Sequence, residues 1–297
     1  MQLSVVIPTR NRRDRLAETL DALAEDALAE EFTGDTAVDG GFEVIVVDDG
    51  SDPGHLDALQ SAPRPFPCRW LQQTGLGPAA ARNRGVQEAC GERILFLGDD
   101  TRPAPGCLAV HAAGEDTGIQ GHIDWDPHVP VSEVMDFLAP EGPQFYFRGL
   151  RPGEPVPYTA VLGSNASFPR RWLVDEPFDE GFPAAAFEDT ELAWRFDAHG
   201  WSTLYRPDAL CWHHHPYPTL DPFLQRQRRA GHAARHAVGK HPRLAGPVVL
   251  WPTLFTGVVF ARHLLRSATG RRRPRDLWDL RCRLAFLRGF LGGFLGR

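Results

Sequence analysis

Asp99 and Asp100 form a pair of adjacent aspartates at the end of the segment FLGDD, directly after an apolar run. Two neighbouring carboxylates repel each other, and a hard divalent cation such as Mg²⁺ or Mn²⁺ would neutralise them and share its coordination shell with phosphate oxygens. We expect Asp100 to be the direct metal ligand, with Asp99 supporting it or reaching a sugar or ribose. A solvated acidic turn is the alternative for this pair taken alone.

A second aspartate pair, Asp48 and Asp49, lies in VVDDGS at the end of another apolar run. A carboxylate at such a position can accept hydrogen bonds from a pyrimidine N–H or from a ribose hydroxyl, as the acidic residue of dinucleotide-binding folds does. The alternative is an Asp-Gly turn with a helix cap, for which Asp, Gly and Ser are the usual residues. This motif by itself leaves both interpretations open.

Glu188 and Asp189, in FEDTEL, are candidates for acid–base chemistry. Acidic residues favour the first turn of a helix because the helix dipole is positive there, so a capping role is the structural alternative. A carboxylate in this position can also take the proton of a hydroxyl group that comes within hydrogen-bond reach. The motif therefore predicts a helix start and permits a general base.

Three consecutive histidines, His213 to His215, follow the segment PDALCW. One imidazole facing the pocket would complete a metal shell opposite Asp100. Side chains alternate along a strand, so His213 and His215 share a face and His214 is expected to be structural or exposed. A zinc site built from these residues alone is not expected, because no cysteine or distant histidine has suitable spacing.

The elements that position these residues are short apolar runs alternating with helical patterns. Strands are expected at residues 3–7, 42–47, 69–72 and 93–97, and helices at residues 14–28 and after Gly77-Pro78. This alternation predicts an open, mostly parallel α/β sheet flanked by helices. Ligands bind beyond the carboxyl ends of the strands in such sheets, and both aspartate pairs lie there.

The rest of the chain has a less regular pattern. Residues 30–41 are expected to form a loop, residues 118–123 and 159–162 short strands in the second half of the same sheet, and the GSNAS segment, residues 163–167, a close turn. A helix is expected to begin near Phe187, and a strand at residues 203–205 precedes the histidines. Beyond Asp221 we expect basic helical segments split at four prolines, Pro242, Pro247, Pro252 and Pro274.

Composition limits the class of protein. The 297 residues are 42% hydrophobic and 24% charged, which favours a folded globular protein over a disordered, collagen-like or coiled-coil chain. Five scattered cysteines without a CxxC spacing argue against a disulfide framework or a thiolate zinc site and favour a reducing cytoplasm. The apolar stretch near the N-terminus is short and its positive charges follow it, so no export signal is expected.

The net charge of −6 conceals a strong asymmetry along the chain. Residues 217–297 contain 16 Lys and Arg against 3 Asp and Glu, whereas the first 216 residues carry a net charge of −19. The longest apolar run, 248–261, is shorter than the roughly 20 residues of a spanning helix and contains Pro252, so no membrane span is expected. Apolar surface combined with cations suits an interfacial helix near anionic lipids. The alternatives are a helical appendage on the acidic body or a homodimer surface; nucleic-acid binding is not expected, since no binding motif is present.

Seven motifs together resemble the family 2 glycosyltransferases, which have the GT-A fold. They are SVVIPTRNR, VVDDGS, GPAAARNRG, LFLGDD, GSNASF, FEDTELAWR and PDALCWH, and their order and spacing cover about residues 1–216. The resemblance implies an inverting transfer of a sugar from a nucleotide-diphosphate donor to an acceptor hydroxyl, assisted by Mn²⁺ or Mg²⁺. Two departures are the long loop at residues 30–41 and the motif GDD in place of a separated DxD.

The same resemblance assigns roles to individual residues. On the donor side, Thr9 and Asp49 contact the nucleoside with Asp48 beside them, Arg82 lines the donor pocket, and Asp99 and Asp100 match the metal-binding motif. On the acceptor side, Asp189 corresponds to the general base and Glu188 assists or positions it. His213 falls where the family places an additional metal or diphosphate ligand.

The resulting expectation is a catalytic domain at residues 1–216 followed by a basic helical extension at residues 217–297. The acceptor is expected to be a glycan or a lipid-linked molecule in cell-surface glycan or glycolipid synthesis, at the inner face of the cell membrane. The alternatives are a nucleotide-sugar or polysaccharide binding module without turnover, and a nucleotidyltransferase. The second is disfavoured because no N-terminal Gly-rich, Lys-containing triphosphate loop is evident.

Overall fold

The computed structural model describes residues 2–27, 41–183, 185–269 and 273–292, which belong to two units. The first unit comprises Met1–Pro130, Ala139–Glu180 and Asp189–Pro216, and the second comprises Val131–Leu138, Gly181–Glu188 and Tyr217–Arg297. The second unit therefore takes in two short segments from the region expected to be catalytic. The predicted loop at residues 30–41 lies outside the described residues, apart from Gly41.

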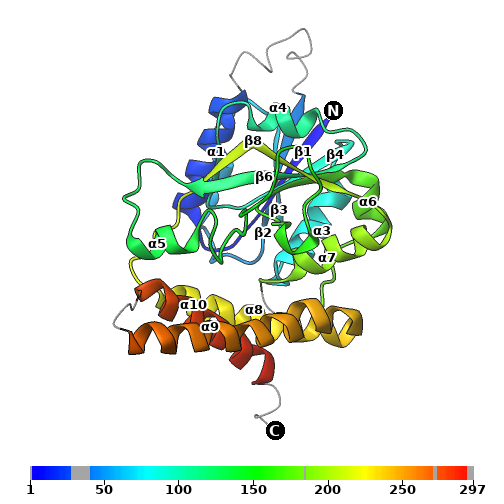
Figure 1. Ribbon diagram of the computed structural model, residues 1–297. Helices are drawn as coiled ribbons and strands as arrows, with labels where there is room; N and C mark the ends of the chain where they lie inside the picture. Colours follow the sequence, from blue (N-terminus) through cyan, green and yellow to red (C-terminus); the bar gives the residue numbers. More distant parts are fainter. Residues whose placement is uncertain (1, 28–40, 184, 270–272, 293–297) are drawn as a thin grey trace. The chain divides into compact units, whose positions relative to one another are not determined.

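An eight-stranded mixed sheet forms the centre of the first unit (Figure 1). In sheet order the strands are β3 (Cys68–Gln72), β2 (Phe42–Asp48), β1 (Leu3–Thr9), β4 (Arg93–Leu97), β7 (Asn165–Pro169), β6 (Gly118–Trp125), β8 (Thr203–His213) and β5 (Thr101–Pro103). The first four run parallel, whereas β7 runs antiparallel to both of its neighbours, β4 and β6. The predicted α/β class with an open, mixed sheet is confirmed.

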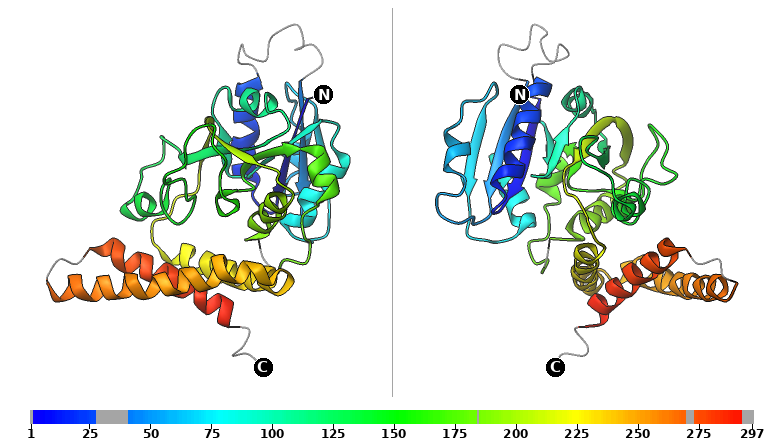
Figure 2. Two further views of the ribbon diagram at one scale, coloured as in Figure 1. Left: turned by 45° about the vertical axis from the view of Figure 1, so that its right-hand side comes forward. Right: turned by 90° about the vertical axis from the view of Figure 1, so that its left-hand side faces the viewer.

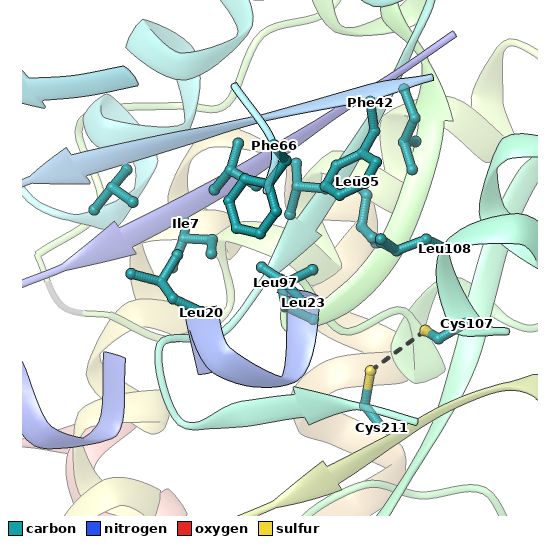
Figure 3. Packing of buried hydrophobic residues seen from close by; sticks show 14 of the residues in the cluster. Ile7, Leu20, Leu23, Phe42, Phe66, Leu95, Leu97, Cys107, Leu108 and Cys211 are labelled. Atoms are coloured by element: carbon teal, nitrogen blue, oxygen red, sulfur yellow. Dashed lines mark hydrogen bonds between the residues drawn. The ribbon is translucent and has the colours of Figure 1, made fainter. Parts of the chain in front are cut away.

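Helices flank this sheet on both faces. They are α1 (Arg13–Ala27), α2 (Asp57–Ser61), α3 (Pro78–Glu88), α4 (Cys107–Ala112), α6 (Arg170–Asp175) and α7 (Glu188–Ala198). Strand side chains alternate between faces. Ile7 of β1 packs in one cluster with Leu20 and Leu23 of α1 (Figure 3), whereas Val6 meets Gly85 of α3, where an added Cβ would overlap the valine. Both faces are thus buried, which explains the continuous apolar run.

The second half of the sheet differs from the prediction in three places. Residues 158–160 form a 3₁₀ turn, so the predicted strand at residues 159–162 is wrong. The strand lies instead at Asn165–Pro169, within the segment predicted as a turn, of which Gly163 and Ser164 remain a turn. The strand predicted at residues 203–205 continues to His213, and its pairing with β6 changes register at Gly121/His122.

The second unit is helical. Its helices are α5 (Glu133–Leu138), α8 (Asp221–Lys240), a 3₁₀ turn at Pro242–Leu244, a π-helical turn at Gly246–Leu250, α9 (Trp251–Ala268) and α10 (Pro274–Leu291) (Figure 2). Helices α8 and α10 pack closely, because Gly231 and Gly289 each allow a carbonyl of the other helix to approach; an added Cβ would overlap Phe286 O or Arg228 O.

Only two of the four prolines divide the helices of this unit as predicted. Pro242 and Pro274 begin new helical segments as predicted, but Pro247 and Pro252 lie inside a continuous helical run, Pro242–Ala268. Proline is tolerated in the first turn of a helix, where its missing N–H has no helical partner to lose. The run has 27 residues, a mean hydropathy of 1.7 over its best 18-residue window, and 17% of that window buried. By length and composition alone it is long enough to cross a membrane, unlike the 14-residue apolar stretch counted from the sequence.

Candidate functional site

The turn after β4 holds the acidic pair Asp99 and Asp100 against Arg12. Arg12 Nη1 lies 2.9 Å from Asp99 Oδ1 and 3.0 Å from Asp100 Oδ2, so one nitrogen bridges both carboxylates. Thr9 Oγ1, at the end of β1, donates a 2.8 Å hydrogen bond to the other oxygen of Asp99. The parallel pairing of β1 with β4 brings these side chains together, because it aligns the carboxyl ends of the two strands.

The two aspartates differ in electrostatic environment. Burial raises the pKa of Asp99 to about 6, against the opposing effect of Arg12. Burial also acts to raise the pKa of Asp100, but His213, Arg12 and His215 together outweigh it and leave that pKa below its usual value. Asp100 is thus the more firmly ionised member, and a charged carboxylate is the form that binds a cation.

The histidines at the end of β8 alternate as predicted. His213 Nε2 lies 3.8 Å from Asp100 Oδ1, and His215 Nδ1 lies 4.0 Å from Asp100 Oδ2. His214 faces away, with Nδ1 at 3.4 Å from Asp126 Oδ2, while its backbone N–H donates to Asp100 O. Predicted residues Asp100 and His213 are therefore neighbours in the structure.

A divalent cation fits the donor set at Asp100. The separations of 3.8 and 4.0 Å are too long for hydrogen bonds, and a carboxylate with neighbouring imidazoles is a donor set that would suit Mn²⁺ or Mg²⁺. No three His, Cys, Asp or Glu side chains in the described residues are grouped to hold an ion by themselves. A cation here would take further oxygen ligands from a bound phosphate, which is how Mg²⁺ is commonly held.

The predicted nucleoside side of the site lies at the end of β2. The backbone N–H of Asp49 donates to Thr9 O at 2.8 Å, which joins this strand end to β1. The carboxylate of Asp49 accepts hydrogen bonds from Gln73 Nε2, Leu76 N and Gly77 N, at 2.7, 2.7 and 2.9 Å. A carboxylate has about four acceptor positions, so Asp49 both organises the loop before α3 and retains capacity for one more donor.

Asp48 has the turn geometry that its sequence suggested as an alternative. Its Oδ1 accepts a 2.9 Å hydrogen bond from Ser51 N, and its side chain is buried. Gly50, in the same turn, has φ of +80°, and a Cβ there would come within 2.9 Å of Gly75 N. The turn therefore requires glycine at this position. The contact of Asp48 with a nucleoside stays a prediction.

Asp189 and Arg82 meet at Gly163. Asp189 Oδ2 accepts a 3.0 Å hydrogen bond from Gly163 N, and its Oδ1 accepts one from Thr190 N in the first turn of α7. Arg82, on α3, donates to Gly163 O at 3.3 Å and lies over the ring of Phe178. Glu188, the first residue of α7, is buried.

Backbone contacts join Gly163 to the acidic pair. The pairing of Leu97 with Asn165 places the Gly163–Ser164 turn beside Gly98, whose N–H donates to Ser164 O at 3.2 Å. The predicted residues of β1, β2, β4, β8 and α7 thus lie along one edge of the sheet; they are Thr9, Asp48, Asp49, Asp99, Asp100, His213 and Asp189.

Arg12 and His215 are neighbours of the acidic pair that were not predicted as site residues. The sequence contains a signal that could have identified Arg12 as a site residue. Arg12 is three residues after Thr9, close to the carboxyl end of a predicted strand. Asn11, with φ of +53°, holds this loop, because its N–H donates to Ser51 Oγ and its Oδ1 accepts from Asp52 N, both at 2.8 Å.

Comparisons with known proteins agree with this architecture. Similar curated proteins include validoxylamine A glucosyltransferase of Streptomyces hygroscopicus subsp. limoneus, 30% identical over 67% of this chain and 48% of that protein. Pre-mycofactocin glycosyltransferase of Mycobacterium tuberculosis is 28% identical over 93% of this chain and 55% of that protein. The chain thus spans about half the length of these relatives.

Two solved structures have a similar fold. The Pyrobaculum calidifontis mannosyltransferase PcManGT, in complex with GDP-Man and Mn²⁺, has a TM-score of 0.64 at 19% identity and covers 98% of this chain and 87% of its own. S. aureus TarS with UDP-GlcNAc has a TM-score of 0.53 at 18% identity, covering 97% and 92%.

Two family models match the chain directly. Glycosyl transferase family 2 matches residues 4–118, which contain both aspartate pairs. Glycosyl transferase family group 2 matches residues 93–293, more than half of the chain. The chain therefore belongs to the family 2 glycosyltransferases.

Proposed function

We propose that this protein transfers a sugar from a nucleotide-diphosphate donor to an acceptor hydroxyl with inversion at the anomeric carbon. The observation that carries this proposal is the continuous polar edge from Asp49 through Thr9 and Asp99 to Asp100, joined to Asp189 by the Gly163–Ser164 turn. Relatives named as glucosyltransferases and a neighbour solved with GDP-Man and Mn²⁺ support the same chemistry.

The donor is held at the ends of β1, β2 and β4. Thr9 and Asp49 take the nucleoside, with Asp48 beside them, Asp99 reaches the ribose or sugar, and Arg82 lines the donor pocket. Asp100 and His213 would hold a divalent cation, Mn²⁺ or Mg²⁺, which when bound would supply positive charge to the diphosphate leaving group. Their separation of 3.8 Å supports this assignment.

Asp189 is the general base in this proposal. The acceptor hydroxyl gives its proton to a carboxylate oxygen of Asp189 and attacks the anomeric carbon from the face opposite the diphosphate. The bond from Gly163 N holds Asp189 Oδ2 in place, and the helix start orients Oδ1 through Thr190 N. Glu188 positions this first turn. A single displacement inverts the anomeric centre.

A nucleotide-sugar screen tests the proposal. Because a ligand that binds only the folded protein raises its melting temperature, we expect one of the UDP-, GDP- or dTDP-sugars to stabilise the full chain in the presence of Mn²⁺ and much less in EDTA. Incubation of that donor with candidate glycan and lipid-linked acceptors should give a product of inverted configuration by NMR. Retained configuration would refute the single displacement. Metal-dependent donor binding without transfer or donor hydrolysis would favour the binding module instead.

The acceptor is proposed to be a glycan or lipid-linked molecule at the inner face of a membrane, met through the second unit. Large apolar side chains are exposed along the helical run; they are Leu250, Trp251, Leu254, Phe255, Val258, Phe260, Leu264 and Leu265. The surrounding residues 217–297 carry a net charge of +13, which complements an anionic lipid surface.

An interfacial position fits this unit better than a span. Arg262 and Arg266 of α9 bind Asp276 of α10, at 3.1 and 2.5 Å, so the two helices are tied together. Helix α10 carries further charges, among them Arg281 and Arg283, which would enter the hydrocarbon beside a spanning α9. Burying such charges in lipid is costly, whereas an interface accepts them.

Vesicle binding tests the interfacial contact. We expect L254E and V258E, at positions 57% and 59% exposed, to reduce sedimentation of the full chain with phosphatidylserine-containing vesicles several-fold. V174E is the control, because Val174 is equally exposed, at 58%, but lies on α6 of the first unit. Equal vesicle binding by all three variants would contradict the contact with lipid. The contact would also be contradicted if the wild type were a dimer in solution and both α9 variants were monomers, because the exposed apolar face would then be a dimer surface.

A further inference from the structure

Arg12 bridges the two carboxylates of the acidic pair to which the metal is assigned. Its Nη1 makes hydrogen bonds to Asp99 Oδ1 and Asp100 Oδ2, at 2.9 and 3.0 Å, and so reduces the charge of the pair from −2 to −1. Its pKa is raised, because the two carboxylates stabilise the charged form by more than the partial loss of solvent around the guanidinium destabilises it. A side chain that is always protonated therefore balances the acidic pair in the absence of a metal.

The loop that carries Arg12 is fixed, but the side chain is not enclosed. Asn11 anchors the loop through its two hydrogen bonds to Ser51 and Asp52. The Arg12 side chain is 45% exposed, whereas those of Asp99 and Asp100 are 9% and 15% exposed. The guanidinium can thus move away toward solvent while the carboxylates stay where Thr9 and the β4 turn hold them.

We propose that Arg12 is a built-in counter-ion that competes with the divalent metal for Asp99 and Asp100, so that metal binding is weak until a nucleotide diphosphate arrives. This inference rests on the metal-assisted function proposed above. A divalent cation beside Asp100 Oδ1, which faces His213, and a guanidinium bonded to Oδ2 of the same carboxylate repel each other, and each reduces the negative charge that the other meets. The diphosphate supplies the missing negative charge, because it offers oxygens to the metal and to the displaced Arg12 alike.

The consequence is cooperative binding of metal and nucleotide. Each ligand raises the affinity for the other by the same factor, since coupling between two binding equilibria is reciprocal. Removing the Arg12 charge should therefore have opposite effects on two measurements. Metal alone should bind more tightly to the uncompensated carboxylates, and nucleotide should gain less from the metal because its arginine partner is lost.

Titration of free Mn²⁺ by electron paramagnetic resonance, with no nucleotide present, tests the proposal on the full chain. We expect R12Q to bind Mn²⁺ at least about tenfold more tightly than the wild type, since the pair regains a full negative charge. R13Q is the matched control, because Arg13 is the adjacent arginine and pairs only with the exposed Asp14 among the described ion pairs. R12K keeps the charge and should stay close to the wild type.

The same titration with UDP or GDP completes the test. We expect the nucleotide to raise the Mn²⁺ affinity of the wild type and R13Q strongly, and that of R12Q several-fold less. If R12Q binds Mn²⁺ alone no more tightly than R13Q while nucleotide still promotes binding in all variants, Arg12 is not the competitor and the proposed metal site stands. If no variant binds Mn²⁺ with or without nucleotide, the metal assignment itself is wrong, and the Arg12 inference falls with it.

Discussion

Transfer activity should fall by about 10²- to 10⁴-fold when Asp189 is replaced by asparagine, the range expected for loss of a positioned general base. The amide of asparagine cannot take the proton of the acceptor hydroxyl, but its oxygen can still accept the hydrogen bond from Gly163 N. The Gly163–Ser164 turn should therefore keep its geometry, and the change removes only the second acceptor, which takes a hydrogen bond from Thr190 N at the start of α7. The loss should appear in kcat, with the affinity for donor and Mn²⁺ nearly unchanged.

The control for D189N is on the same helix. Asp197 lies near the other end of α7 and is exposed, so D197N makes the same chemical change away from the predicted site. We expect D197N to retain wild-type transfer. Measuring transfer and donor binding in parallel distinguishes loss of the general base, which lowers transfer alone, from a general disturbance of the helix, which would lower both. Unchanged transfer in D189N, or an equal loss in D197N, would refute the assignment of Asp189.

The first half of the fold was predictable because its signals are local. Leu16, Leu20 and Leu23 repeat at helical spacing, and the apolar run of β1 is buried on both faces. These patterns can be recognised without knowing which distant residues cover them. The aspartate pairs could be placed for the same reason, since each directly follows a buried strand and the carboxyl ends of parallel strands share one edge.

Strand β7 could not be predicted in this way, because its buried positions include polar residues. Asn165 and Ser167 are fully buried and gain hydrogen bonds from partners far along the chain. His111 bonds to both side chains, and Arg93 Nη1 donates to Ser167 Oγ at 3.0 Å. A local pattern of Gly, Ser and Asn indicates a turn, and only tertiary hydrogen bonds satisfy it as a strand.

Arg12 illustrates the corresponding limit for the site. Its type and its position after β1 are visible in the sequence, but its two partners lie 87 and 88 residues away and depend on the pairing of β1 with β4. The histidines were easier to place, because strand alternation alone separates His213 and His215 from His214. The face that a side chain takes along an extended segment can thus be predicted better than the distant residue that it meets across the sheet.

Removal of the Asp100 carboxylate should weaken Mn²⁺-dependent donor binding by about 100-fold or more, since even the hydrogen-bond partners of metal ligands contribute 10- to 100-fold to metal affinity. The expected loss of transfer is about 10³-fold, corresponding to several kcal/mol of charge stabilisation at the leaving diphosphate. D100A should leave the turn folded, because Asp99 keeps its bonds from Thr9 and Arg12 and the backbone oxygen of residue 100 still accepts from His214 N.

D100A also distinguishes the contribution of the Asp100 carboxylate from that of the Asp99 carboxylate. Without the Asp100 carboxylate, Arg12 retains Asp99 as its partner, so the remaining pair is close to neutral and offers a cation little attraction. Donor binding should then be the same with Mn²⁺ or EDTA, as isothermal titration calorimetry can measure. D116N is the surface control, since Asp116 is 82% exposed and pairs with Arg171. If D100A gave the wild-type Mn²⁺ titration curve, the cation would bind elsewhere. The 3.8 Å separation between Asp100 and His213 would then not mark a metal site.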